Sequence, residues 1–399
     1  MTAATSFLSA TVLIDKITEK IEEYDEHPDL QNASYETGLL GYSLYYLYLS
    51  QYKNDASFVE LASQYLEKGI ASLDLKNFKR AYSTDSLDLH LSHIGRFIIF
   101  CAKHKLLEID SADYLNHLDG ILFDLMKSKV TIKDFDSGSG AMASAYYFLA
   151  RHKSGVSQEE KLVYLVNSLD NFALKDSAGN YYWQSPSLNK RVYLGLSHGS
   201  ALMISMLSNI HECGIAQEQC SVIIEKATNF LIKQYRRCRY KGLFPTKIGD
   251  RVEPMQFALC YGDVGIGYAL YRAAKILDSQ KIGTLAEIVL NDCLTRTKED
   301  NLTLDAGIYY GASGLAIAFD KIGAVTGDDR FIKRADYWYS QIPGYSIFDD
   351  QFAGFRSRLS NDVVIWNVSE GWGIIGIGIS LMCHQKRNLP SLAELTFIA

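Results

Sequence analysis

The sequence predicts an all-α protein with an (α/α)7 fold, in which seven outer and seven inner helices form a closed toroid or barrel. A step close to Gly-x-x-Gly recurs seven times, each step runs directly into an apolar helical stretch, and the 399 residues include only six prolines. Self-similarity at a repeated spacing indicates a repeat architecture. The gaps of 45 to 63 residues leave room for two helices per repeat, and the first step positions are Gly38, Ser92, Ser137, Gly199, Gly262, Gly311 and Gly373.

Amphipathic stretches between the steps are expected to form the outer layer of helices. Their apolar residues recur at three- and four-residue spacing beside a charged face, which is typical of a helix with one wet side. Six of these stretches lie near residues 11–24, 58–73, 159–174, 219–238, 285–299 and 331–342.

The stretches that follow the steps are expected to form the inner layer. They are apolar nearly all round, as in GIGYALYRAAKIL and IIGIGISLMC, and a helix without a polar stripe is a buried helix. An open solenoid is the alternative to a ring, but it would need polar capping repeats at its ends, and none is evident. We therefore expect a closed ring and a single domain over residues 1–399.

Composition excludes several classes of protein. The net charge is -6 and the pI about 5.9, so nucleic acid is not an expected partner. The seven cysteines are scattered and odd in number, which fits a reducing compartment. The N-terminus has neither the basic start nor the long apolar run of a signal peptide, and no stretch of about 18 apolar residues predicts a membrane span. We expect a cytoplasmic protein.

Polar and aromatic side chains stand directly in front of the steps. Ring closure would bring them to one end of a central cavity, where helix N-termini favour anions and thiolates. Such a set can transfer protons and activate sulfur. The sequence has no Walker loop, dinucleotide fingerprint or His-Glu-x-x-His motif. The candidates in the two positions before each step include Glu36, His90, Asp136, His198, Cys260, Tyr261, Tyr309, Tyr310 and Trp372.

Three connections are long and rich in aromatic, polar and turn residues. They cover residues 175–194, 239–257 and 343–370. Because long loops in a compact domain are often functional, we expect them to form the rim of a substrate site at the same end as the steps.

The segments GLSHG (Gly195–Gly199), LCYGDVG (Leu259–Gly265) and IYYGASG (Ile308–Gly314) resemble three motifs of the lanthionine synthetase C-like (LanC) family. The resemblance extends over essentially the whole chain. It implies the same (α/α)7 toroid and a role in lanthipeptide biosynthesis. The best-known members are cyclases that add peptide cysteine thiols to dehydroalanine or dehydrobutyrine and so form thioether rings.

The resemblance also implies a zinc site made of one cysteine and a Cys-His pair, which this chain does not reproduce. Cys260 is the only matching ligand position, because Tyr309 and Tyr310 replace the pair. Neutral tyrosine is a poor zinc ligand, and one thiolate cannot supply three ligands. Cys383 and His384 lie roughly 15 Å along the last inner helix from its step. We expect no cofactor; zinc held by Cys260 with His90 and His198 is the alternative.

By the same resemblance, His198 and Tyr261 are the predicted catalytic residues. The acidic catalytic residue before the third step is Asp136 or Asp134, with the register left open. Cys260, Tyr309, Tyr310, Trp372, His90 and Glu36 are the predicted substrate-binding residues. Members of the family also tend to carry an arginine one turn before the motif that LCYGDVG resembles, and the corresponding place in this chain is near Gln256.

The favoured function is therefore a lanthipeptide cyclase-like activity without the usual zinc site, although the sequence leaves open whether the chain is an enzyme. Its expected partners are a dehydrated precursor peptide and, more distantly, a lanthipeptide dehydratase and an exporter. One alternative is a non-catalytic protein that binds a peptide or a modifying enzyme. A carbohydrate-active α/α-barrel enzyme is less favoured, since it would need two close carboxylates, and Glu36 and Asp136 lie two repeats apart.

Overall fold

The structure is a computed structural model that describes residues 8–236, 242–249 and 256–399. The chain divides into two compact units. Unit 1 comprises Met1–Leu73 and Thr303–Leu392, and unit 2 comprises Asp74–Leu302 and Ala393–Ala399. The prediction of one domain over residues 1–399 stays a prediction.

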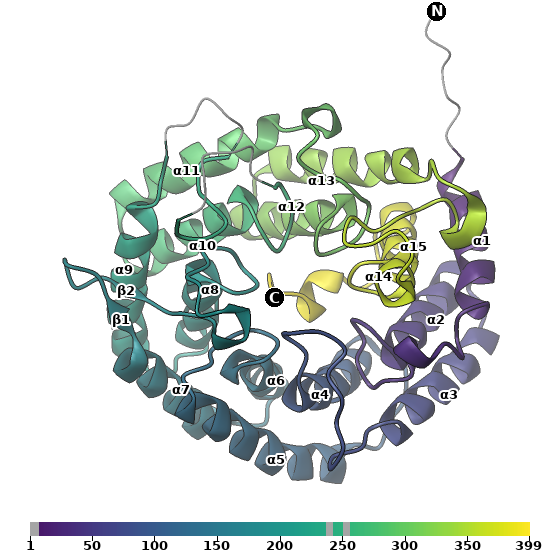
Figure 1. Ribbon diagram of the computed structural model, residues 1–399, viewed down its shortest axis with the longest axis horizontal. Helices are drawn as coiled ribbons and strands as arrows, with labels where there is room; N and C mark the ends of the chain where they lie inside the picture. Colours follow the sequence, from purple (N-terminus) through teal and green to yellow (C-terminus); the bar gives the residue numbers. More distant parts are fainter. Residues whose placement is uncertain (1–7, 237–241, 250–255) are drawn as a thin grey trace, which may run out of the picture. The chain divides into compact units, whose positions relative to one another are not determined.

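Unit 1 contains two layers of helices (Figure 1). The outer layer consists of α1 (Ala10–Glu22), α3 (Ser57–Ala71) and α13 (Asp329–Gln341). The buried layer consists of α2 (Leu39–Lys53), α12 (Ala312–Thr326) and α15 (Ile374–Gln385), with the short α14 (Val364–Val368) before α15.

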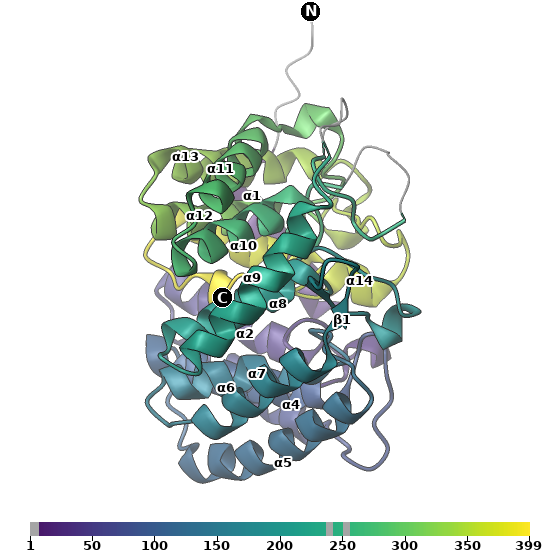
Figure 2. The same ribbon diagram turned by 90° about the vertical axis from the view of Figure 1, so that its left-hand side faces the viewer.

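Unit 2 repeats this arrangement, and Figure 2 shows its helices α8 and α9 side by side. The buried layer consists of α4 (Leu87–His104), α6 (Ala141–Lys153), α8 (Ser200–Glu212) and α10 (Asp263–Ile276). The outer layer consists of α5 (Ala112–Thr131), α7 (Glu159–Phe172), α9 (Gln217–Ile232) and α11 (Gln280–Thr295). A two-stranded hairpin of β1 (Leu174–Lys175) and β2 (Tyr181–Tyr182) follows α7.

Burial separates the two layers as the hydrophobic pattern predicts. Every residue of α2 from Leu39 to Ser50 is buried, whereas α1 buries only Leu13, Ile14, Ile17 and Ile21. A helix that is apolar all round belongs between other helices, and an amphipathic helix covers them with one face. The expected inner and outer roles are therefore confirmed.

The first and last repeats meet inside unit 1. Helix α15 packs against both α1 and α2. The Tyr48 hydroxyl on α2 donates to the carbonyl of Pro390 at 2.8 Å, and the Lys386 ammonium donates to the carbonyl of Gln51 at 2.6 Å. An open solenoid would keep its terminal repeats apart, so the expected meeting of the two ends is confirmed.

Two of the seven predicted steps need correction. Helix α4 begins at Leu87 and is capped by Ser86, whose hydroxyl accepts from Leu89 N. Ser92 therefore lies inside the helix, because a serine cap and not a glycine step starts this repeat. In the third repeat the residue that caps α6 is Gly140, three positions beyond Ser137. The other five steps begin their helices at the predicted glycine.

The six predicted outer stretches do not include α5. Helix α9 ends at Ile232, before the end of the stretch predicted near residues 219–238. Cys238 lies outside the described residues. The part of the connection before α10 that is described, residues 242–249, pairs with the connection before α8: Leu194 N donates to Thr246 O at 3.1 Å and Ile248 N to Val192 O at 2.9 Å. Within unit 2, two of the long connections are thus joined by backbone hydrogen bonds.

Candidate functional site

The loops that lead into the buried helices share one construction. In four repeats the first amide of the helix donates to the carbonyl of the residue six positions before the capping glycine. The donor–acceptor pairs are Leu39–Asn32 at 2.9 Å, Ala141–Asp134 at 2.9 Å, Ser200–Tyr193 at 3.2 Å and Ala312–Asp305 at 3.0 Å. Each loop therefore closes on its own helix N-terminus, which satisfies an amide that a helix leaves without an internal partner.

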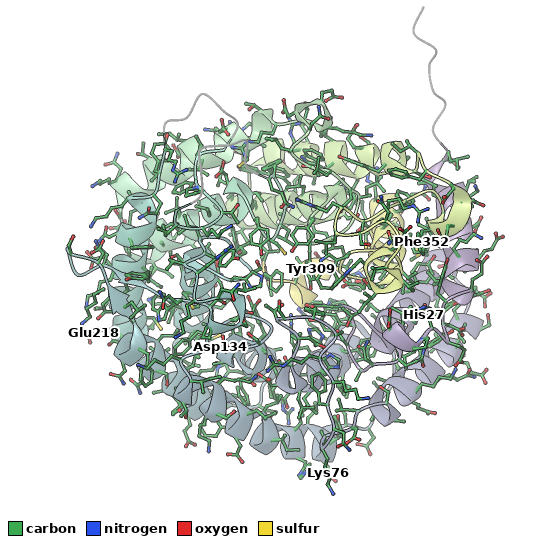
Figure 3. All side chains as sticks on the ribbon, viewed as in Figure 1. His27, Lys76, Asp134, Glu218, Tyr309 and Phe352 are labelled. Carbon is green, nitrogen blue, oxygen red and sulfur yellow. The ribbon has the colours of Figure 1, made fainter. Side chains whose placement is uncertain are left out.

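Asx side chains tighten this loop in three repeats. The Oδ1 atoms of Asn32, Asp134 and Asp305 each accept the backbone N–H two residues further on, all at 3.0 Å. Asp134 (labelled in Figure 3) has the same bond as Asn32 and Asp305 in other repeats. The shared position gives Asp134 a part in holding its turn.

Side chains and backbone of successive loops are linked inside each unit. In unit 2 the Ser137 hydroxyl donates to Ser197 O at 2.5 Å, and the Ser197 hydroxyl donates to Cys260 O at 3.4 Å. In unit 1 Tyr309 N donates to Gly371 O, and Gly371 N donates to Glu36 O. Residues at the predicted steps or two positions before them thus lie next to one another within each unit.

A histidine–aspartate pair stands among the unit 2 loops. His198 Nδ1 lies 2.6 Å from Asp136 Oδ2, although the two residues are 62 positions apart in sequence. Asp136 is buried, and the His198 side chain keeps 13% of its surface exposed. Of the two acidic candidates that the sequence left open, the structure brings Asp136 to His198.

The Asp136 carboxylate accepts four hydrogen bonds. Its Oδ1 accepts from Gly138 N at 3.0 Å and Ser139 N at 3.4 Å, and its Oδ2 accepts from His198 and from the Ser185 hydroxyl at 2.7 Å. Burial alone would raise its pKa, but the facing imidazole and these donors outweigh burial and hold the pKa of Asp136 below its usual value. An ionised carboxylate only accepts, so Nδ1 of His198 carries the hydrogen of this bond, and in a neutral imidazole of this tautomer the lone pair is on Nε2.

Two tyrosine rings pack around His198. The Tyr193 ring meets it edge-on at 5.7 Å between centroids, and the Tyr261 ring lies 5.9 Å from it. Tyr193 and Tyr261 stack on each other at 6.1 Å, and the Lys247 ammonium lies 6.0 Å from the Tyr193 ring centroid. All three rings are only partly buried. They form a partly open aromatic surface around the imidazole.

The first glycine of the motif GLSHG is explained by close packing of two loop backbones. A Cβ atom at Gly195 would lie 2.5 Å from the carbonyl oxygen of Cys260. Only glycine lets the loop before α8 approach the loop before α10 so closely. This approach puts buried Cys260 and partly exposed Tyr261 beside the segment that carries His198.

Unit 1 has its own cluster, made of Glu36, Tyr309 and Trp372. The hydroxyl of Tyr309, which is labelled in Figure 3, donates to Glu36 Oε1. The Trp372 ring packs edge-on against the Tyr309 ring at 4.9 Å. All three residues are buried. Burial, followed by the nearby carboxylates of Glu36 and Glu370, raises the pKa of Tyr309 well above its usual value, so this phenol is neutral at physiological pH.

Tyr310 lies differently from its neighbour. Its ring is partly exposed, and the Arg358 guanidinium lies over it at 5.5 Å. Arg358 belongs to the long connection 343–370, and its backbone N–H donates to Asp305 Oδ2 at 2.9 Å. This bond ties the connection to the loop before α12.

His90 is placed within α4 and pairs with Asp85, whose Oδ1 lies 2.8 Å from His90 Nε2. The exposed fractions of the two side chains are 3% and 1%, and the Phe78 ring meets His90 edge-on. The predicted role of His90 in substrate binding was based on a step at Ser92, which the structure places inside α4. The bond between Asp85 and His90 joins the residues before α4 to its first turn.

The residues do not fit the zinc site that the family resemblance implies. Tyr309 is a neutral phenol whose proton is directed to Glu36. Within the part of the chain that the structure describes, no three His, Cys, Asp or Glu side chains gather in a group that could hold a metal ion. Cys260 remains the one ligand-type residue among the three implied positions.

Sequence reasoning missed Ser185, Tyr193 and Arg358, which lie in or directly beside the long connections. Those connections were expected to surround the site, but they carry no periodic pattern that would single out a side chain. Tyr193 had one usable signal: it stands six residues before a capping glycine, in the position of Asp134 and Asp305.

Comparison with known proteins gives a family and a fold. The family model described as "Lanthionine synthetase C-like protein" matches residues 29–336. Among solved structures, nisin cyclase matches with a TM-score of 0.74 and 17% identity, over 97% of this chain and 98% of that chain. The match shows that the chain has the (α/α)7 toroid fold of that protein. A search among curated proteins found no match. Among the described residues no helix is both long and apolar enough to cross a membrane.

Proposed function

The chain belongs to the lanthionine synthetase C-like family, and we propose that it is a peptide cyclase that joins cysteine thiols to dehydroalanine or dehydrobutyrine residues. The observation that carries the proposal is the bond between His198 Nδ1 and Asp136 Oδ2 at 2.6 Å, on a histidine that is partly exposed. A base oriented by a buried carboxylate is an arrangement suited to proton transfer to and from a substrate. The name of nisin cyclase, with its shared fold, supports the same reaction class.

In the proposed reaction His198 Nε2 takes the proton of a peptide cysteine. The sulfur then forms a bond to Cβ of the dehydro residue, whose carbon–carbon double bond becomes an enolate. Protonation at Cα completes the thioether, so one proton moves from sulfur to carbon and no oxidant or reductant is consumed. Asp136 keeps the imidazole in the required tautomer and stabilises its charged form. Tyr261, partly exposed beside His198, is the second proton donor that we propose.

We propose that this reaction proceeds without a metal. A free thiol has a pKa of about 8.5, so a few per cent is thiolate at neutral pH and reacts readily. Holding the thiol and the dehydro residue at reacting distance can supply a large part of the rate. The neutral Tyr309 in the position of a metal ligand supports the proposal.

For substrate contacts we propose Cys260 and Tyr261, which lie near His198 in unit 2. The predicted substrate-binding role of Tyr310, in unit 1, stays a prediction. We propose that the buried residues Glu36, Tyr309 and Trp372 support, from the interior of unit 1, the surface that carries Tyr310. The expected partners are a dehydrated precursor peptide in the cytoplasm and, beyond it, the dehydratase and exporter that handle the same peptide.

The test uses the full chain and a dehydrated precursor peptide encoded near it. Cyclisation is scored as loss of alkylatable thiol by mass, with and without chelator. We expect cyclisation in both samples. His198→Asn should slow it about 10²–10⁴-fold, the range of general acid–base catalysis. His117→Asn is the matched control, because His117 is exposed on α5, and it should leave the rate unchanged.

Loss of activity with chelator, or one tightly bound zinc per chain, would contradict the metal-free reaction. A folded protein that binds dehydrated peptide without consuming any thiol would instead support the non-catalytic binding role.

A further inference from the structure

Ser185 contacts the His198–Asp136 pair from a distant part of the sequence. It lies at the entry to the 3-10 turn Pro186–Leu188, in the connection between β2 and α8, and is buried. Its hydroxyl donates to Asp136 Oδ2 at 2.7 Å, the same oxygen that His198 Nδ1 approaches at 2.6 Å. Two side chains therefore share one carboxylate oxygen.

The other carboxylate oxygen is fixed by backbone. Gly138 N and Ser139 N donate to Oδ1 from the turn before α6. The turn of Asp136 therefore sets one edge of the carboxylate, while the orientation of Oδ2 depends on Ser185 and His198. Because a hydroxyl donor draws negative charge from the oxygen it contacts, Ser185 weakens the pull of Oδ2 on the imidazolium.

Ser185 is itself held firmly. Its N–H donates to Arg191 O at 3.1 Å, and its carbonyl accepts from Lys190 N at 3.0 Å. Two positions on, the Ser187 hydroxyl lies 2.7 Å from the Ser139 hydroxyl, which donates to Asp134 Oδ2 at 2.9 Å. In the segment Ser185–Ser187, Ser185 thus contacts Asp136 directly, whereas Ser187 is linked to Asp134 only through Ser139.

We propose that Ser185 is a positioning residue that acts through Asp136 to set the orientation and basicity of His198, and so joins the connection 175–194 to the reaction. The catalytic consequence rests on the proposed function. The effect on the His198 imidazole does not, since it follows from the hydrogen bonds alone.

The test is an NMR titration of ring-labelled histidine in the full chain, with the His198 signal assigned by its loss in His198→Asn. Ser185→Ala should raise the pKa of His198 by about half a unit to one unit, because Oδ2 loses a donor and becomes a stronger partner for the imidazolium. Ser185→Thr keeps the hydroxyl and should restore the wild-type pKa. The groups facing His198 are Asp136, Tyr193, Tyr261 and, over Tyr193, Lys247.

Ser187→Ala is the matched control, because its hydroxyl serves Ser139 and not Asp136; it should leave the pKa of His198 unchanged. Ser185→Cys, nearly the same size with a weaker donor, should give an intermediate shift and serves if the alanine variant does not fold. The proposal is overturned if the pKa of His198 rises in neither Ser185→Ala nor Ser185→Cys, or if Ser187→Ala shifts it equally.

Activity adds a second readout. In the cyclisation assay the rise of rate with pH should move upward in Ser185→Ala by the same shift as the pKa, with KM nearly constant. If no peptide is cyclised at all, the proposed function fails, yet the titration still decides the role of Ser185.

Discussion

Asp136 and Asp305 lie in comparable loops, yet their pKa values shift in opposite directions. Burial raises the pKa of Asp136, but the imidazole and the three further donors that it faces lower its pKa by more. Asp305 is equally buried, but its side chain accepts from the backbone N–H groups of Gly307 and Arg358, and burial raises its pKa to about 6. The same loop therefore holds a carboxylate ready to orient a base in one repeat and a carboxyl group that resists ionisation in another.

This difference predicts how Asp305→Asn changes stability with pH. The folded-state pKa of Asp305 is about 6 and its ordinary value is 3.8. Folding therefore favours the protonated carboxyl group. Its contribution to the free energy of unfolding is complete at a pH below the ordinary pKa. This contribution falls by at most about 3 kcal/mol as the pH rises through the folded-state pKa. Urea unfolding of both proteins between pH 4 and 7 measures the effect. The wild type should lose stability relative to Asp305→Asn across this range, and a constant difference would contradict the assignment.

How much of the site the sequence could predict depends on the residue. His198 and Tyr261 were among the candidates because they precede glycines that recur along the sequence, and their catalytic role was predicted from the family resemblance. The choice between Asp134 and Asp136 could not be made, because the third capping glycine lies three residues later than expected, at Gly140. Ser185 lies in a loop whose path depends on tertiary contacts, so no local sequence pattern predicts its contact with Asp136.

At the scale of the element, the loop before α10 imposes the strictest demand on its glycine. Gly262 has a φ of 107°, a region that residues with a side chain seldom adopt. A Cβ atom there would also collide with the carbonyl oxygen of Gln256. The recurrent step is therefore a steric requirement at this position.

Gly262→Ala should destabilise the protein by about 1–3 kcal/mol, since both the backbone and the contact are strained. The matched control is Gly120→Ala in the middle of α5, where a Cβ atom meets nothing within 4 Å. That change should stabilise by about 0.5–1 kcal/mol, because alanine is the better helix former. Thermal unfolding of the two variants measures both; equal effects would refute the steric account.

At the scale of the whole chain, the helical repeat was predictable because burial in each layer follows from local pattern. The missed outer helix α5 carries that pattern too, with Leu115, Leu118, Leu122, Met126 and Val130 buried on one face. The predicted start of the second repeat was wrong because its buried helix begins after a serine cap. The step predicted at Ser92 therefore lies inside the helix. The division into two units has no counterpart in the spacing of the steps.

The meeting of the first and last repeats gives the final prediction. A Cβ atom at Gly378 of α15 would lie 2.6 Å from the Tyr45 ring and 3.1 Å from the Ile17 side chain. Gly378→Val should therefore push α15 away from both α1 and α2 and cost about 2–4 kcal/mol, as overpacking of a buried contact does. Gly283→Val in α11 is the control, since its nearest neighbour is 3.8 Å away. Amide hydrogen exchange should show lost protection in α1 and α15 together, because each end of the chain covers the other. Loss confined to α15 would mean that the last helix is only an appended end, and that the two terminal repeats do not stabilise each other.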